Sequence, residues 1–443
     1  MQASGQTLPK ACGSWADLKA AYRLLSNPRV DLQAIGQPHR RQTFAACTGP
    51  AVVLSIEGTT ELDLTTKTAM RGRGRLGGGS TRGLLQHRAL AVVPAEDDAA
   101  LETPAARVLG LLHQQWDRRT DPPAGETLRP LQARRTDGDV WLETAQGVAG
   151  LGVFPGRLIH VTDRAGDMFR FLQGVEQLDH GFVVRARYDR TLQGPGLSEE
   201  DLPPTLWASL RAQPVAGTRR LRVHEQRTVK GVVRCAAREV TVAVRYRAVA
   251  LTPPRNDPRT AGAGPPACYA VFVEEQNPQG PTPPLQWLLL TSEPVTAVAE
   301  AWRIVHYYRH RWIIEEWHRA LKEGCRVEEV SFDDALDVQR LAAIQGIVAV
   351  RLLQLRELAQ KADAQPAALQ QAVPGTWIRV VAALAKVPAL TLTPQQFWLT
   401  IAKQGGYLAR RRDPRPGWKV LWRSWSDLQH MVRGVEAVEA SCG

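Results

Sequence analysis

A segment near the middle of the chain, RLIHVTDRAGDMFRFL (Arg157 to Leu172), places an apolar run, an acidic residue and a helical pattern in direct succession. The run is typical of a buried strand that leads into a helix, an order that belongs to α/β folds. It puts Asp163 at the carboxyl end of the strand. A carboxylate there can face a cleft without losing its hydration, although an aspartate is also a good helix N-cap.

Three further strands are predicted before this segment, in AVVLSIE, in GLLQHRALAVVP (Gly83 to Pro94) and in ARVLGLLHQQWD (Ala106 to Asp117). Their order along the chain favours an antiparallel meander. The stretch TAMRGRGRLGGGSTRG is rich in glycine and arginine and cannot pack a core, so it is expected to form a loop. That loop could contact phosphates or be a solvated hairpin tip.

The second half of the chain changes character twice. Alternating patterns with proline-rich joins between about 188 and 284 predict a β-rich insertion. Long helices are expected at about 295–324 and 334–361, and a smaller helical region follows. An N-terminal helix is predicted in WADLKAAYRLLS, because Asn27 and Pro28 end its pattern.

A formal net charge of +12 makes nucleic acid the leading class of partner, although some basic proteins bind none. No apolar run approaches the roughly 18 to 20 residues of a membrane helix. No membrane contact is therefore expected, and a cytoplasmic, nucleoid-associated location is. The six cysteines form no C-x-x-C pair, which favours reduced thiols over a zinc site.

The segment YYRHRWIIEEWHRALK (Tyr307 to Lys322) carries mixed polar groups at helical spacing. On one continuous helix, Tyr308, Arg311, Glu315 and Lys322 fall within an arc of about 60°, and the opposite side is apolar. A carboxylate can bind a divalent cation, whereas arginine, lysine and tyrosine can hold phosphate oxygens. The stripe therefore indicates a phosphodiester site, with a solvated surface helix as the alternative.

The spacing Y-x2-R-x3-E-x6-K in this segment resembles the signature of bacterial DDE transposases of the insertion-sequence-four group. Further family-like segments follow in the expected order: ACGSWADLKAAYRLLSNPRV, GLLHQQW, VTDRAGDMF, PLQWLLLTSEP, VRLLQLREL and GGYLARRRDPRPGWKVLW. The resemblance implies an α/β fold with a ribonuclease-H-like catalytic core, a β-rich insertion and a C-terminal helical dimerisation domain. It places a truncated N-terminal helical remnant for binding DNA ends at 1–46, the catalytic domain at 47–330 with its insertion at about 190–285, and the dimerisation domain at 331–443.

In such enzymes two aspartates and a glutamate hold two Mg²⁺ ions, for which Mn²⁺ can substitute. The ions activate a water or a 3′-hydroxyl and stabilise the leaving oxygen. By the resemblance, Glu315 is the glutamate and Asp163 the second aspartate, so both are expected metal ligands. Tyr308, Arg311 and Lys322 would position the terminal phosphates of the transposon end.

The first aspartate is where the sequence departs from the family. The family has an acid before two threonines after its first core strand, whereas this chain has Gly58-Thr59-Thr60. Backbone freedom at a turn would explain a glycine, but beside Asp163 and Glu315 we interpret Gly58 as a missing ligand. Glu57 should face away if the strand is regular, and Asp63 lies past the expected turn, so rescue by either needs a rearrangement.

Two hypotheses follow. The first is a homodimeric, metal-dependent transposase that cleaves and joins double-stranded DNA at transposon ends and in target DNA, impaired by Gly58. The dimer would form only on bound ends, through Leu352, Leu353, Leu355 and Leu358, unless these leucines are ordinary core. The alternative is a catalytically inactive, transposase-derived DNA-binding protein or repressor.

Further residues are candidates for DNA contact. By the resemblance Trp287 would accept a base flipped from the stack, although a core role is the alternative. Each phosphate neutralised should steepen the salt dependence of binding by about 0.9 in log-log slope. The candidate cations, any of which could instead be solvated surface charge, are Arg185, Arg187, Arg190, the Arg71 to Arg82 loop, Arg410, Arg411 and Arg412.

Overall fold

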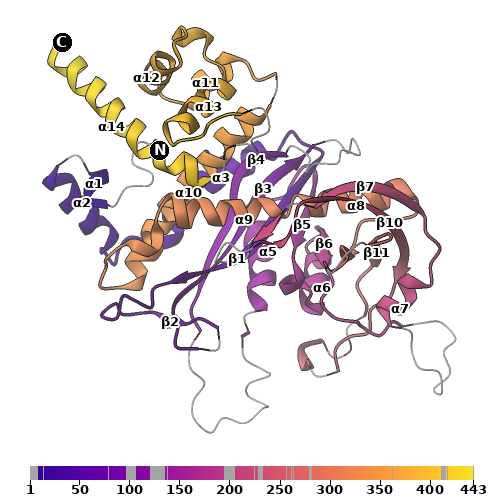
Figure 1. Ribbon diagram of the computed structural model, residues 1–443. Helices are drawn as coiled ribbons and strands as arrows, with labels where there is room; N and C mark the ends of the chain where they lie inside the picture. Colours follow the sequence, from indigo (N-terminus) through magenta and orange to yellow (C-terminus); the bar gives the residue numbers. More distant parts are fainter. Residues whose placement is uncertain are drawn as a thin grey trace.

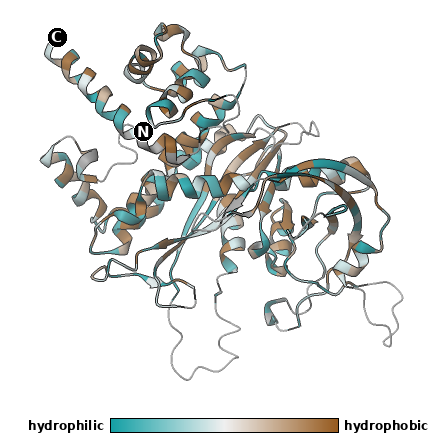
Figure 2. Cartoon of the chain, in the orientation of Figure 1, coloured by the Kyte–Doolittle hydropathy of each residue, from teal (hydrophilic) through white to brown (hydrophobic). Residues whose placement is uncertain are grey.

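The computed structural model shows a mixed α/β protein built on one long sheet (Figure 1). It describes residues 8–12, 14–77, 79–95, 106–119, 135–136, 138–193, 205–223, 225–227, 233–255, 257–260, 262, 264–278, 282–361, 363–410, 416 and 418–442. Apolar segments concentrate in the strands of the sheet and on the helices against it (Figure 2).

The sheet begins with the predicted meander. β1 (Val52–Asp63), β3 (Arg82–Pro94) and β4 (Ala106–Asp117) pair antiparallel, and a short β2 (Gly74–Arg75) extends β3 within the glycine-rich segment. On its other side β1 pairs in parallel with β5 (Arg157–Thr162), which pairs in parallel with β6 (Gly181–Arg185). The meander and the strand before Asp163 are therefore confirmed.

The predicted β-rich insertion is also confirmed as β structure, and its strands continue the same sheet. From β6 the order runs through β12 (Gln286–Thr291), β11 (Cys268–Glu275), β10 (Arg238–Val249) and β7 (Gly217–Val223), all antiparallel. A small hairpin of β8 (Gln226–Arg227) and β9 (Val233–Cys235) and the helix α7 (Leu206–Arg211) lie among them in sequence.

Helices cover both faces of the sheet. On one face, α5 (Asp139–Ala149) and α6 (Phe169–Gln177), reached from β5 through the short η1 (Arg164–Gly166), form a core with β6, β11 and β12. On the other, α8 (Val298–Arg309), α9 (Trp312–Arg319) and α10 (Ala335–Gln360) share the larger core with β1, β3 and β4. Alternation along β1 sends Leu54 and Ile56 to the α9 side.

The single helix predicted from 295 to 324 is wrong. It is three elements: α8, α9 and the π-helical η3 (Ala320–Gly324). At the first break, the amides of His310 and Arg311 donate to the carbonyls of Tyr307 and Tyr308, which tightens the backbone to an i to i−3 pattern. At the second, the chain widens, and the Cys325 amide donates to Ala320.

α3 (Leu32–Ala46) begins after Asp31, whose side chain caps it by accepting from the Gln33 amide. α5 begins at Asp139, which lies in its first turn.

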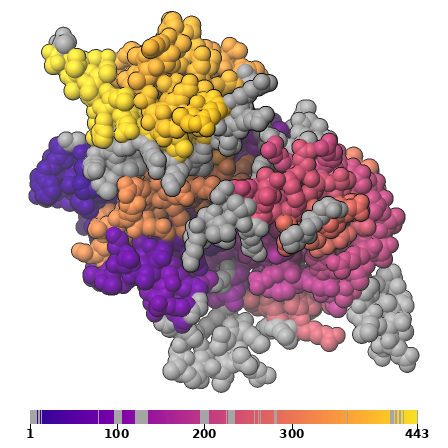
Figure 3. Space-filling model, in the orientation of Figure 1, coloured from indigo at the N-terminus to yellow at the C-terminus, as the bar shows by residue number. Residues whose placement is uncertain are grey.

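The C-terminal helices α11 (Pro366–Ala372), α12 (Gly375–Ala385), α13 (Pro394–Gln404) and α14 (Trp418–Cys442) gather around α10 and form a lobe at one end of the molecule (Figures 1 and 3). Leu352, Leu353 and Leu355 are at most 2% exposed and belong to the large core. Three of the four leucines of the proposed dimer surface are thus core residues of this chain, which was the alternative interpretation, and Leu358 is partly exposed. The burial of these three between the sheet and the lobe removes them from any surface.

Among the described residues, no helix combines the length and the apolar character that crossing a bilayer requires.

Candidate active site

Glu315 lies on α9 with its carboxylate held by Arg311 and His318. Nη1 of Arg311 donates to Glu315 Oε1 over 2.9 Å, and Nδ1 of His318 lies 3.7 Å from Oε2. The proximity of His318, followed by the Arg311 hydrogen bond, lowers the pKa of Glu315 to about 2 despite partial burial. The carboxylate is therefore ionised at neutral pH and already engaged within the chain.

Asp163 follows β5, where the sequence predicts it. Its Oδ1 accepts from the Ala165 amide at 2.8 Å and caps η1, so the capping alternative is realised as well. The charge of Asp163 also affects Arg311. Burial lowers the pKa of the Arg311 guanidinium, but the nearby Tyr308, Glu315 and Asp163 raise this pKa. Arg311 is thus electrostatically linked to both remaining carboxylates of the predicted triad.

Gly58 is in the interior of β1, so the turn interpretation is wrong. It pairs with Arg88 of β3 in an uninterrupted antiparallel ladder. In the parallel ladder the last pair is Ile56 with Val161 of β5. Extending this register by two residues, to the residue after β5, would bring Gly58 level with Asp163.

The Cα of Gly58 faces α9. A Cβ there would lie 3.1 Å from both γ carbons of Ile314 and 3.2 Å from His318 Cε1. An aspartate at this position would point towards the helix turn that carries Glu315, but into closely packed atoms. Its introduction therefore requires Ile314 or His318 to move.

The residues present do not fit a two-metal centre. Gly58 supplies no ligand, and Glu315 is bound by Arg311. Within the described ranges, no group of three or more histidine, cysteine, aspartate or glutamate side chains lies close enough together to hold a metal ion. Mg²⁺ can be held by one or two carboxylates with water and phosphate oxygens, but two ions share the ligands of a two-metal centre, and here one of the two carboxylates is paired with a guanidinium.

Glu57 faces the opposite side of the sheet, as strand alternation predicts. Its fully buried Oε1 lies 2.5 Å from His160 Nδ1, and His160 Nε2 lies 3.0 Å from His180 Nδ1. On the other flank His87 Nε2 is 3.7 Å from Oε2. Burial raises the pKa of Glu57, but His160 and His87 outweigh it and lower the pKa to about 2.

Asp63 ends β1 and accepts from the amide and hydroxyl of Thr65. Along the β1–β3 ladder the register runs without a shift from Leu54 to Asp63. Neither Glu57 nor Asp63 is therefore shifted to the position of Gly58, where the first aspartate is missing.

The remaining members of the predicted polar stripe separate, because the helix is broken. The Tyr308 side chain is buried, and its ring packs edge-on against that of Trp287 at 5.4 Å between centroids. Trp287, on β12, is half-buried against the core. Lys322, on η3, donates to the Glu61 carbonyl and lies 3.4 Å from Glu328. Tyr308 stays beside Arg311, whereas Lys322 joins the end of β1.

The predicted DNA-contacting arginines have unequal settings. Arg190 is mostly buried in an ion pair with Asp167 at 2.6 Å, and Arg185 donates to the Gln286 carbonyl at 3.0 Å. Arg187 is exposed, with its guanidinium 5.4 Å from the Tyr188 ring. Arg187 is therefore the best placed of the three to reach a phosphate.

In the glycine-rich loop, the Arg73 side chain donates to four carbonyls, those of Leu64, Thr65, Thr68 and Met70, and so orders the loop. Arg411 and Arg412 lie outside the described residues.

Sequence reasoning missed two residues near Glu315. His318 lies one helical turn after it, at a spacing that could have drawn attention. Arg88 is completely buried on the α9 side of β3, and the polar run Gln86-His87-Arg88 inside an apolar strand was the available signal. His318 borders the space that a first aspartate would occupy, and Arg88 is the partner of Gly58 in the β1–β3 ladder.

Comparison with known families adds one finding. The family model described as transposase DNA-binding matches residues 1–30. In the structure this segment includes α1 (Leu8–Ala11) and α2 (Trp15–Leu25), and α2 is tied to the start of α10. Arg340 donates to the carbonyls of Leu25 and Val30, and Ser26 donates to Asp337. The match supports a transposase-related protein that binds DNA.

Proposed function

We propose that the protein is a DDE transposase of the insertion-sequence-four group, with motifs that most resemble those of the transposon-five transposase. It binds transposon ends as a homodimer and cleaves DNA very poorly. The matched N-terminal segment supports the DNA-binding part. One observation supports the impairment: a side chain at Gly58 would face the helix of Glu315, and the register of β1 with β5 leads towards Asp163, where the resemblance expects a third carboxylate.

The side chains around Glu315 suit phosphate binding better than cleavage. Two divalent ions, when held by a full carboxylate triad, would supply the nucleophile and stabilise the leaving oxygen. This chain offers a guanidinium, Arg311, that hydrogen-bonds to Glu315 and is electrostatically linked to Asp163. Arg311 can donate to a phosphate oxygen of a DNA end.

A second candidate function is a repressor or an inert partner in mixed dimers, which keeps DNA binding and lacks cleavage entirely. The Arg311–Glu315 pair favours it, because a carboxylate that is already neutralised by arginine attracts a cation less. The two candidates differ only in whether residual, Glu315-dependent cleavage exists.

Strand nicking of a transposon-end duplex in Mg²⁺ or Mn²⁺ tests the proposal. We expect almost no nicking by the native chain. Gly58→Asp should restore some, and Gly58→Asp with Ile314→Ala should restore more, since alanine removes both γ carbons that crowd the new side chain. Adding Glu315→Ala to the double variant is the control and should abolish the gain.

Robust nicking by the native chain that disappears in Glu315→Ala would refute the impairment. If the Ile314→Ala variant alone nicked as well as the double variant, the carboxylate would not be the cause. If Gly58→Asp produced no gain in either background, the repressor would be favoured.

A further inference from the structure

A second basic region lies at the other end of β1, away from Gly58. A cavity of about 790 Å³ is bounded by the start of β1 at Val52, the end of β3 at Pro94, and α8. Three arginines line it, Arg107 of β4, Arg219 of β7 and Arg303 of α8, and its described lining contains no aspartate or glutamate. The cavity therefore attracts anions.

A second cavity lies next to this one. A cavity of about 390 Å³ between α3, β4 and α10 shares Ala46 and Arg107 with it, and adds Arg351 and Lys361. Both α3 and α10 pack on β4, which forms the floor between them (Figure 1). Five cationic side chains thus follow one path from α8 across β4 to α10. We call this path the Arg107 groove.

One carboxylate lies in the groove, and the fold limits its effect. Glu357 Oε2 accepts from the Val108 amide at 2.8 Å, which directs it to the β4 backbone. Burial raises the pKa of Glu357 to about 7, so its negative charge is only partly present at neutral pH. Lys361 Nζ lies 3.9 Å from it.

The cations are held in different ways. The Arg219 guanidinium lies 4.9 Å from the Trp302 ring, a cation–π contact that fixes the position of its charge beside the cavity. Arg351 is exposed on α10, and its Nη1 donates to Gln354 at 2.9 Å. Arg303 is 3.8 Å from Glu300 on the same helix and is about half exposed.

We propose that the Arg107 groove binds the phosphodiester backbone of a second DNA segment, separate from the DNA end at Glu315. An extended polyanion fits better than a small one, because the charges line two adjacent cavities that share Ala46 and Arg107 and do not converge on one point. The proposal rests on the proposed DNA-binding function and adds to it a second contact surface at the other end of β1.

The test is the salt dependence of binding to a short random-sequence duplex without terminal repeats, measured by fluorescence anisotropy. The groove variant is Arg107→Gln with Arg303→Gln. The control, Arg211→Gln with Arg255→Gln, removes the same charge from exposed arginines that line neither cavity. We expect the groove variant to bind more weakly and its log-log slope to fall by about 0.9 for each phosphate that it no longer neutralises. The control should keep the native slope.

Equal slopes in the two variants would overturn the groove while leaving DNA binding intact. A native chain that binds no duplex would overturn the groove and the proposed function together. Displacement of the duplex from the native chain by a deoxymononucleotide, with no such effect in the groove variant, would show a small-anion site and also refute the proposal. Anisotropy reports binding alone, so a failure to nick DNA does not alter these outcomes.

Discussion

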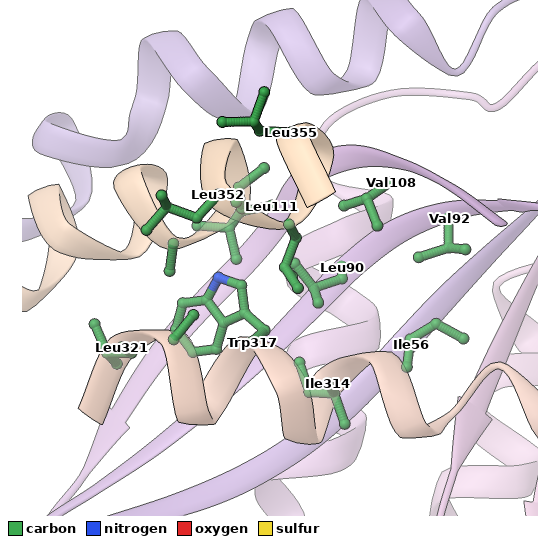
Figure 4. Close-up of a cluster of buried hydrophobic side chains, with 14 of the residues drawn as sticks. Ile56, Leu90, Val92, Val108, Leu111, Ile314, Trp317, Leu321, Leu352 and Leu355 are labelled. Atoms are coloured by element: carbon green, nitrogen blue, oxygen red, sulfur yellow. The ribbon is translucent and has the colours of Figure 1, made fainter. Parts of the chain in front are cut away.

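The guanidinium carbon of Arg88 lies 4.1 Å from the centroid of the Trp317 ring, and both side chains are completely buried between β3 and α9. Nη2 of Arg88 donates to the Ala342 carbonyl at 3.0 Å, which ties the same group to α10. Figure 4 shows Trp317 projecting from α9 into the apolar cluster with Leu352 and Leu355 of α10. Burial holds the pKa of Arg88 well below its usual range. A buried cation that hydrogen-bonds to a backbone carbonyl therefore supports the wall of the candidate site.

Removal of the Arg88 side chain should destabilise the protein more than its replacement by an apolar chain of similar length. Arg88→Ala leaves a cavity against Trp317 and should lower the free energy of unfolding by about 3 kcal/mol. Arg88→Met fills the space without burying a charge and should stay within about 1.5 kcal/mol of the native chain. Urea unfolding measures both. Equal losses in the two variants would show that the hydrogen bond to Ala342 matters more than packing.

Gly58 and Ile314 should be energetically coupled. In the native background Gly58→Ala brings a methyl within 3.1 Å of Ile314, which offsets the entropic gain of replacing a strand glycine. In the Ile314→Ala background the same methyl fills space, so it should stabilise. We expect a coupling energy of about 1–2 kcal/mol from a double-mutant cycle in urea. Additive effects would show that α9 shifts freely away from β1.

Stability should fall as the pH decreases from about 6.5 to 4. Burial lowers the pKa of His180 to about 4, so the unfolded chain binds a proton that the folded chain does not. A base with a depressed folded pKa stabilises the fold above its unfolded pKa, and this contribution is lost towards the folded pKa. His180→Gln should reduce the loss by about 2 kcal/mol. The exposed His430, changed to glutamine, is the control and should leave the pH profile of unfolding unaltered.

The carboxylate of Glu57 extends this dependence to lower pH. Its pKa of about 2 means that Glu57 stabilises the fold above the unfolded value, near 4.5, and that this stabilisation is lost as the pH falls towards 2. Glu57→Gln should remove the acid-sensitive part below pH 4.5 while lowering stability at pH 7, because His160 loses its charged partner. Chemical unfolding at a series of pH values distinguishes this effect from that of His180.

Much of the strand order and the position of Asp163 could be predicted, because alternation and the strand-acid-helix succession are local patterns. The break between α8 and α9 could not be predicted, because a helical wheel assumes a continuous helix. The two residues with i to i−3 hydrogen bonds change the direction of the side chains that follow them. The π-helical η3 could not be predicted either, and it contains Lys322 and changes the direction of that side chain. The Arg311–Glu315 pair did survive, because it lies within one helical turn beyond the break.

The strand conformation at Gly58 could not be predicted for a different reason. Composition around it favours a turn, and only pairing with β3 and β5, set by residues far away in sequence, keeps the strand straight. Likewise, burial of Leu352 and its neighbours depends on the C-terminal helices that cover α10. The sequence shows that α10 has an apolar face, but it does not show which helices cover that face.

Arg340 should control how the N-terminal segment is held. Its side chain is 3% exposed, pairs with Asp337 at 3.1 Å and donates to the carbonyls of Leu25 and Val30. Arg340→Met leaves Asp337 buried without its cation and should lower stability by about 3 kcal/mol. Release of α2 should also expose its amides, so hydrogen exchange at residues 15–25 should accelerate more than at β1. The variant Arg379→Met, at an exposed ion pair with Glu439, is the matched control. If both variants exchanged alike at α2, the segment that matches the transposase DNA-binding model would be held by apolar contacts instead, such as that of Tyr22 with Phe332.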